Sequence, residues 1–107
     1  MSNTTEGRRD LDTYVILRRA GWRTAKELQE SAARSAAEGE RTPDDVRWIR
    51  SYVVAESTGG LGTLCVFRAS SPEAIRAHAQ RADLPVDEIV KVADTLILHP
   101  DPVPATA

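Results

Sequence analysis

Two histidines and one cysteine are the side chains of this chain best suited to bind a transition metal. His78 lies on the inner stripe of an expected helix, but no histidine, cysteine or carboxylate lies one helical turn away, so the helix offers no local ligand pair. Cys65 lies in the most apolar segment, where a buried thiol usually behaves as a small hydrophobe. His99 stands two residues before Asp101 in the tail, and such a pair can hold a metal ion loosely. His78, His99 and Cys65 are therefore metal candidates, with a structural role favoured for His78 and Cys65 and a solvated tail favoured for His99.

Trp48, Arg50 and Tyr52 form a second group, at alternate positions of an expected strand. Side chains two residues apart in a strand point to the same side, so the spacing predicts one face with an aromatic plane, a cation and a phenol. Such a face can line a pocket for a small anionic or planar ligand. It can equally form a dimer interface, where these residue types are enriched. The residue types favour an interface or a pocket edge over catalysis.

A strand pair must position these residues. Apolar and polar side chains alternate over 46–55, which predicts a strand. The glycines of Ser57–Gly60 supply a tight turn, so the next strand should run antiparallel. Residues 62–69, GTLCVFRA, are apolar on both faces, which indicates a central strand.

A capped helix follows this strand pair. Ser70 and Glu73 match a capping box, and Pro72 suits the first helical turn. The helix should end at Leu84, because a residue before proline avoids the helical region.

The rest of the chain repeats the same plan. Residues 12–19 read as a first strand, and Thr24 with Glu27 predicts a helix that ends near Gly39. Residues 89–98 read as a last strand, interrupted by charges as edge strands often are.

The order βαββαβ predicts an α+β, ferredoxin-like domain. Its four-stranded antiparallel sheet should carry both helices on one face, with the first and third strands central. A sheet covered on one side usually buries its open face against a partner. The sequence therefore predicts a homodimer, arranged as a dimeric α+β barrel.

Several motifs together resemble a bacterial family catalogued as a domain of unknown function (number four-two-four-two). They are WIRSYV, LCVF, the run ASSPEAIR-x-HA and DLPVDEI, within a likeness that covers roughly Tyr14 to Leu98. The resemblance implies a ferredoxin-like fold and dimerisation. Some members are labelled nickel-binding proteins, so it also implies nickel as a candidate cofactor.

Composition sets further bounds on this 107-residue chain of net charge -2. Acids and bases are interspersed, which argues against nucleic-acid binding. No apolar run approaches the ~20 residues of a membrane span. A single cysteine cannot form an intrachain disulfide, which makes the cytoplasm the expected location. We expect a mobile leader at 1–11, one domain at 12–98 and a disordered proline-rich tail at 99–107.

Three functions stay open at this point. The resemblance favours a dimeric, non-enzymatic binding or sensing module for nickel, another transition metal or a small ligand. A small enzyme of the dimeric α+β barrel type would use His78 as acid or base, and Arg50 or Tyr52 to hold an anion or an oxygen. A protein-interaction adaptor would use the open face of the sheet.

Overall fold

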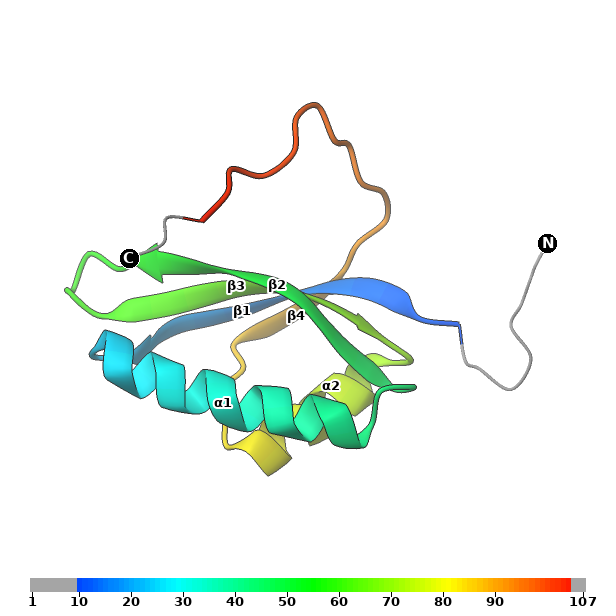
Figure 1. Cartoon of the computed structure of the whole chain (residues 1–107), viewed down its shortest axis with the longest axis horizontal. Helices are drawn as coiled ribbons and strands as arrows, with labels where there is room; N and C mark the ends of the chain where they lie inside the picture. Colours follow the sequence, from blue (N-terminus) through cyan, green and yellow to red (C-terminus); the bar gives the residue numbers. More distant parts are fainter. Residues whose placement is uncertain (1–9, 105–107) are drawn as a thin grey trace.

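The computed structural model describes residues 10–104, so most of the predicted leader and the last three residues of the predicted tail lie outside the described part. Six elements follow the predicted βαββαβ order (Figure 1). The elements are β1 (Asp12–Trp22), α1 (Ala25–Arg41), β2 (Val46–Ala55), β3 (Leu61–Ala69), α2 (Pro72–Ala82) and β4 (Glu88–Lys91). The predicted α+β, ferredoxin-like fold is confirmed.

The four strands form one antiparallel sheet in the order β2-β3-β1-β4. The central places of β1 and β3 were predicted, and so were the edge places of β2 and β4. Both helices cover the same face of the sheet, and no helix of residues 10–104 lies on the other face (Figure 1). We call these the covered face and the open face.

Local capping fixes both helix starts. The Thr24 side chain accepts a hydrogen bond from the Glu27 N–H and begins α1 as predicted. The cap of α2 is Ser71, which accepts from the Ala74 N–H, so the predicted cap at Ser70 is wrong by one residue. Ser70 instead donates its hydroxyl to Asp45, which ties the start of α2 to the loop before β2.

The helix ends also depart from simple sequence signals. Helix α1 continues past Gly39 to Arg41, two residues beyond the predicted stop. Helix α2 ends at Ala82, two residues before the predicted Leu84. Its C-cap, Asp83, adopts a left-handed conformation with φ 57° and donates its N–H back to the last turn.

The hydrophobic core lies between the covered face and the helices. Alternate residues of β1 and β3 point into it, as the period of a strand requires. Its buried members are Tyr14, Ile16, Val46, Cys65, Phe67, Ala69 and Ile75. Helix α1 contributes buried serines instead of large apolar groups, so it presents a shallow inner surface.

The last strand is shorter than predicted. The sequence predicted a strand over 89–98, but β4 ends at Lys91, and its last ladder bond runs from the Val92 N–H to the Thr13 carbonyl. Asp94 then accepts a hydrogen bond from the Thr95 N–H, a local bond that competes with strand pairing. The chain leaves the sheet there and passes over the open face (Figure 1).

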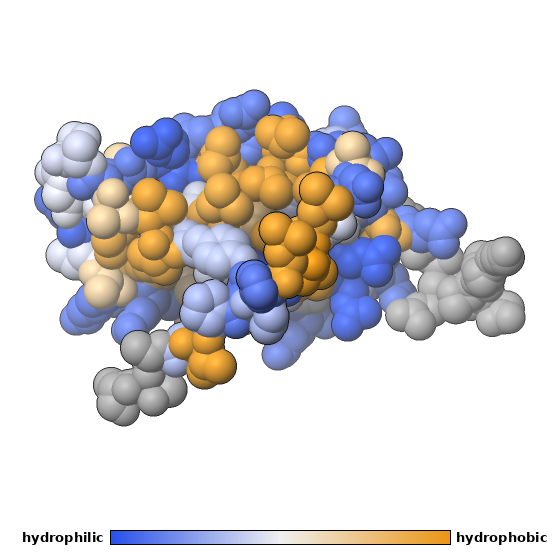
Figure 2. Space-filling model, turned by 90° about the horizontal axis from the view of Figure 1, so that it is seen from above, coloured by the Kyte–Doolittle hydropathy of each residue, from blue (hydrophilic) through white to orange (hydrophobic). Residues whose placement is uncertain are grey.

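Apolar side chains gather on the open face (Figure 2). Val54 of β2 and Val90 of β4 are exposed there. In the segment that follows β4 (residues 92–104, called the tail from here on), Leu96 and Leu98 are 88% and 89% exposed. No helix in the described part of the chain is long and apolar enough to span a membrane.

Candidate functional site

A β-bulge in β2 separates the three residues that the sequence placed together. Trp48 pairs with Phe67, whereas Arg50 pairs with Val66, the adjacent residue of β3. The extra residue, Ile49, reverses the phase of side-chain alternation beyond it. Trp48 therefore lies on the covered face, while Arg50 and Tyr52 lie on the open face. The prediction that all three share one face is wrong.

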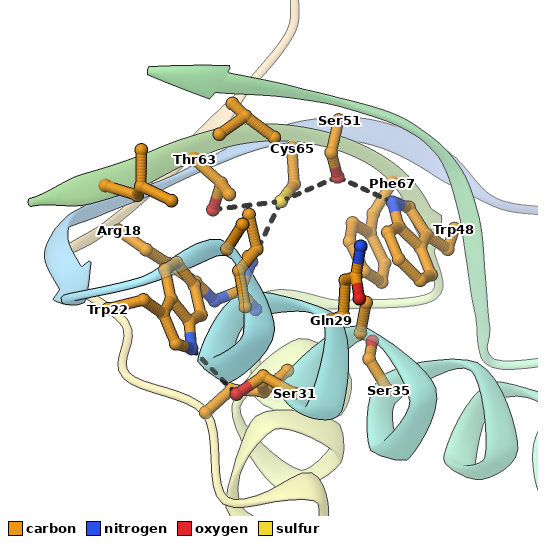
Figure 3. A pocket seen from close by; sticks show the side chains of 16 residues that line it. Arg18, Trp22, Gln29, Ser31, Ser35, Trp48, Ser51, Thr63, Cys65 and Phe67 are labelled. Atoms are coloured by element: carbon orange, nitrogen blue, oxygen red, sulfur yellow. Dashed lines mark hydrogen bonds between the residues drawn. The ribbon is translucent and has the colours of Figure 1, made fainter. Parts of the chain in front are cut away.

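A cavity of about 540 Å³ lies between the covered face and α1 (Figure 3). Its size is within the range of small-molecule sites, about 300–1,000 Å³. Trp48 and Val53 of β2 and Gln29 of α1 line the cavity and are exposed, so it opens between the edge strand and the helix. The other walls are largely apolar and aromatic. They include Trp22, Leu28, Leu61, Phe67 and Leu84.

Hydrogen bonds fix the two tryptophans of the chain, both of which line this cavity. Trp22 donates its indole N–H to Ser31 Oγ over 2.7 Å, and Trp48 donates to Ser51 Oγ over 2.7 Å. Trp48 also stacks on Phe67, with ring centroids 6.2 Å apart and planes 6° from parallel. The cavity thus has rigid aromatic walls (Figure 3).

Arg18 is the only cationic residue of the described part of the chain that lines the cavity. It projects from the central strand β1 and is only 2% exposed. Its Nε donates to the Pro85 carbonyl over 2.7 Å, and its Nη1 donates to Cys65 Sγ over 3.1 Å. Its Nη2 is buried and has no hydrogen-bond partner among the described residues. Burial lowers the pKa of the guanidinium, and the Cys65 group partly opposes that shift.

Cys65 connects the polar groups of the cavity. Its Sγ accepts from Arg18 and from Ser51 Oγ, the latter over 3.0 Å, and donates to Thr63 Oγ1 over 3.4 Å (Figure 3). The cysteine is buried, as the structural interpretation of this residue required, but it is part of a polar cluster. Sequence reasoning missed the other members. The available signal was the parity of Tyr14, Ile16 and Arg18, which share one face of β1.

The backbone at Arg18 is held by close packing. A Cβ on Gly62 would come within 2.5 Å of the Arg18 carbonyl oxygen and of the Glu56 carboxylate, so only glycine fits there. Glu56 in turn accepts hydrogen bonds from the Ala20 N–H and the Arg19 side chain. These contacts fix the end of β1, from which the Arg18 side chain enters the cavity.

His78 lies under the sheet and is 1% exposed. Its Nε2 is 3.1 Å from Ser35 Oγ, and its ring meets Phe67 edge-on with centroids 5.7 Å apart. Its Nδ1 is buried without a hydrogen-bond partner in the described region. Burial lowers the pKa of His78, the charges of Arg81 and Arg18 lower it further, and Glu38 opposes them. The ring is therefore neutral near pH 7.

The tail brings a third group together, on the open face. Asp101 Oδ2 accepts from Arg50 Nη1 over 2.9 Å and from Tyr52 Oη over 2.7 Å. His99, two residues earlier, is exposed. Sequence reasoning placed Asp101 beside His99 but did not connect it to β2, because that contact joins residues about fifty positions apart.

The cavity does not fit a nickel ion. Within residues 10–104, no three histidine, cysteine or acidic side chains gather into a metal-binding group. Cys65 faces the cation of Arg18, which would repel a metal ion. His78 uses one ring nitrogen toward Ser35 and has the other sealed in the core.

Comparisons with known proteins agree with this fold. A family model described as nickel responsive protein, SCO4226-like, matches residues 14–92. No curated protein matches the chain. The crystal structure of SCO4226 from Streptomyces coelicolor A3(2) aligns with a TM-score of 0.63 at 20% sequence identity, over 78% of this chain and 99% of that one. An identity this low shows the shared fold alone.

Proposed function

The chain belongs to the nickel-responsive SCO4226-like family, and we propose that it is a homodimeric binding module whose cavity between α1 and the sheet holds a small molecule. One observation carries the proposal: a cavity of about 540 Å³ with rigid aromatic walls encloses a small cluster of buried polar groups. Apolar walls with few polar groups at fixed positions are the usual composition of a ligand site.

The surroundings of His78 favour binding over catalysis. A general acid or base must reach its substrate directly or through one water. The His78 ring does not line the cavity; its Nε2 contacts Ser35, which does. Among the described residues that line the cavity there is therefore no histidine or carboxylate to serve the enzyme alternative as a proton-transfer group.

A second copy of the chain is the partner we propose for the open face. Val54, Val90 and the tail residues Leu96 and Leu98 are exposed on that side. A two-fold dimer would cover these apolar groups with the same groups of the other copy. The Arg50, Tyr52 and Asp101 cluster would then form part of its polar rim. A cytoplasmic location stays a prediction.

Nickel binding is supported by the family description, and we propose His99 as its donor in this chain. His99 is exposed, whereas His78 and Cys65 are buried and engaged in hydrogen bonds. Two tails on one face of a dimer would supply two such histidines. Calorimetric titration of tag-free protein with nickel(II) should show binding that His99→Gln removes and His78→Gln leaves unchanged. The reverse result would reject this assignment.

The cavity itself is tested with 4-phenylbutanoate as the probe. Tryptophan fluorescence reports binding directly, because both tryptophans line the cavity. Ala32 lines the cavity from α1, so Ala32→Phe should fill it and abolish a saturable fluorescence change. Ala33→Phe is the matched control, because Ala33 is the exposed neighbour outside the cavity. Absence of binding, or binding unaffected by Ala32→Phe, would overturn the proposed function.

A further inference from the structure

Arg18 is a buried cation that forms no ion pair with the described residues. The ion pairs of the described residues use other basic residues: Arg19 with Glu56, Arg23 with Glu27, Arg41 and Arg81 with Glu38, Arg50 with Asp101, and Lys91 with Asp12. No carboxylate of the described part pairs with Arg18, although it is 2% exposed. A charge removed from water is strongly unfavourable unless an opposite charge or hydrogen bonds replace its hydration.

The neighbours of the guanidinium accept hydrogen bonds from only two of its three nitrogens. Nε and Nη1 have acceptors, whereas Nη2 is buried with none. The sulfur acceptor, Cys65 Sγ, is shared, because it also donates to Thr63 Oγ1. Arg18, which lines the cavity, therefore has one unused donor nitrogen, and no carboxylate of the described residues pairs with its charge.

The residues that line the cavity indicate which kind of ligand would pair with the Arg18 guanidinium. A guanidinium matches a carboxylate in shape and charge, and such charge-assisted bonds are stronger than neutral ones. Arg18 is the only charged residue among those that line the cavity, so a single negative charge is balanced there. Trp22, Trp48 and Phe67 offer apolar surface to the remainder of the molecule. A metal ion is excluded by the same cation.

We propose that the cavity binds an organic monocarboxylate with an apolar body, whose carboxylate accepts hydrogen bonds from Arg18 Nη2. This inference rests on the proposed function, since it names the ligand class of the same cavity. The apolar body lies against the tryptophans and Phe67, and it reaches solvent between α1 and β2. Ser51 and Thr63 hold Cys65 in place, and Cys65 in turn orients the guanidinium.

Two probes of equal shape test the charge requirement. 4-Phenylbutanoate and its neutral amide, 4-phenylbutanamide, are titrated into the full chain, with tryptophan fluorescence as the readout. We expect the acid to bind at least about tenfold more tightly than the amide. Arg18→Met should reduce the ratio of the two affinities to about one. Arg76→Met is the matched control, because it removes an exposed arginine from α2 outside the cavity, and it should keep the preference.

A second variant keeps the test decisive. Arg18→Lys retains the charge but loses the planar fork, so it should show an intermediate preference, and circular dichroism checks that each variant is folded. Equal affinity of the two probes for the unmodified protein, or a preference that survives Arg18→Met, would overturn the inference. If both probes bind equally and Ala32→Phe blocks both, the cavity still binds small molecules as proposed, but the requirement for a carboxylate is wrong. If neither binds, both proposals are wrong.

Discussion

Arg18 and Arg50 lie on opposite faces of one sheet and differ in burial and in their partners. Arg50 is exposed and pairs with the Asp101 carboxylate over 2.9 Å. Arg18 is buried and has a thiol and a carbonyl as its partners. An exposed ion pair contributes little to stability, because water competes for both charges. A buried unpaired cation is unfavourable, so its presence in the cavity is better explained by binding than by stability.

The two faces of β3 provide the largest contrast in stability. Phe67 is 1% exposed on the covered face, while Val66, its neighbour, points to the open face. Phe67→Ala should lower the free energy of unfolding by about 3–5 kcal/mol, because it leaves a cavity in the core. Val66→Ala should cost about 1 kcal/mol. Urea unfolding of both variants measures the difference, and equal costs would contradict the division into faces.

Val53 and Val54 test which face forms the dimer. They are consecutive in β2, 56% and 39% exposed, and point to the covered and the open face respectively. Val54→Arg should weaken dimerisation by roughly 100-fold, because a buried two-fold contact would bring unpaired charges together. Val53→Arg should leave the dimer intact. Light scattering over a dilution series distinguishes the two, and a monomeric parent protein would reject the dimer.

Arg18 should be nearly neutral for stability despite its burial. Without ligand, Arg18→Met should change the free energy of unfolding by no more than about 1 kcal/mol, because the lost hydrogen bonds are offset by removal of a buried charge. The Pro85 carbonyl that it releases belongs to an exposed residue and can bind water. Thermal and urea unfolding provide the measurement. A loss of about 3–5 kcal/mol would instead assign Arg18 to the structural core.

His78 should make stability depend on pH. Its folded pKa lies below its ordinary value of 6.5, mainly because of burial. The unfolded chain therefore binds a proton more readily, and acid favours unfolding. Stability should be full above pH 6.5, fall as the pH decreases through that value and level off below the folded pKa. His78→Gln should flatten this dependence, with His99→Gln as the control. An unchanged pH profile in His78→Gln would contradict the assignment.

The Arg50 pair should give the smallest effect. Asp101→Asn keeps an acceptor for Tyr52 Oη and removes the charge opposite Arg50. We expect a small loss of stability, reduced further by added salt. Urea unfolding at low and high salt checks this expectation. A larger, salt-resistant loss would mean that the tail is a structural part of the open face.

Much of the fold was predictable because its signals are local. The cap at Thr24, the alternation in β1 and the turn before β3 each depend on a few adjacent residues. The bulge at Ile49 was not predictable, because a single extra residue leaves no mark in the apolar pattern. Its consequence is large, since it moves Trp48 away from Arg50 and into the cavity wall.

The site was harder to predict than the fold. His78 and Cys65 attracted attention through their chemistry, but their roles depend on partners 43 and 47 residues away in the chain. Arg18 stood in a charged pair at the end of a strand, where arginine is usually exposed. The strand parity indicated that it points inward. The cavity itself depends on how far the small residues of α1 stand from the sheet, which no local pattern specifies.

A crystal structure of the chain with 4-phenylbutanoate is the most direct test of the central claim. The account predicts the carboxylate within ~3 Å of Arg18 Nη2, with the phenyl ring between Trp22, Trp48 and Phe67. A ligand bound on the open face would contradict it. So would a ligand in the cavity with its carboxylate directed away from Arg18.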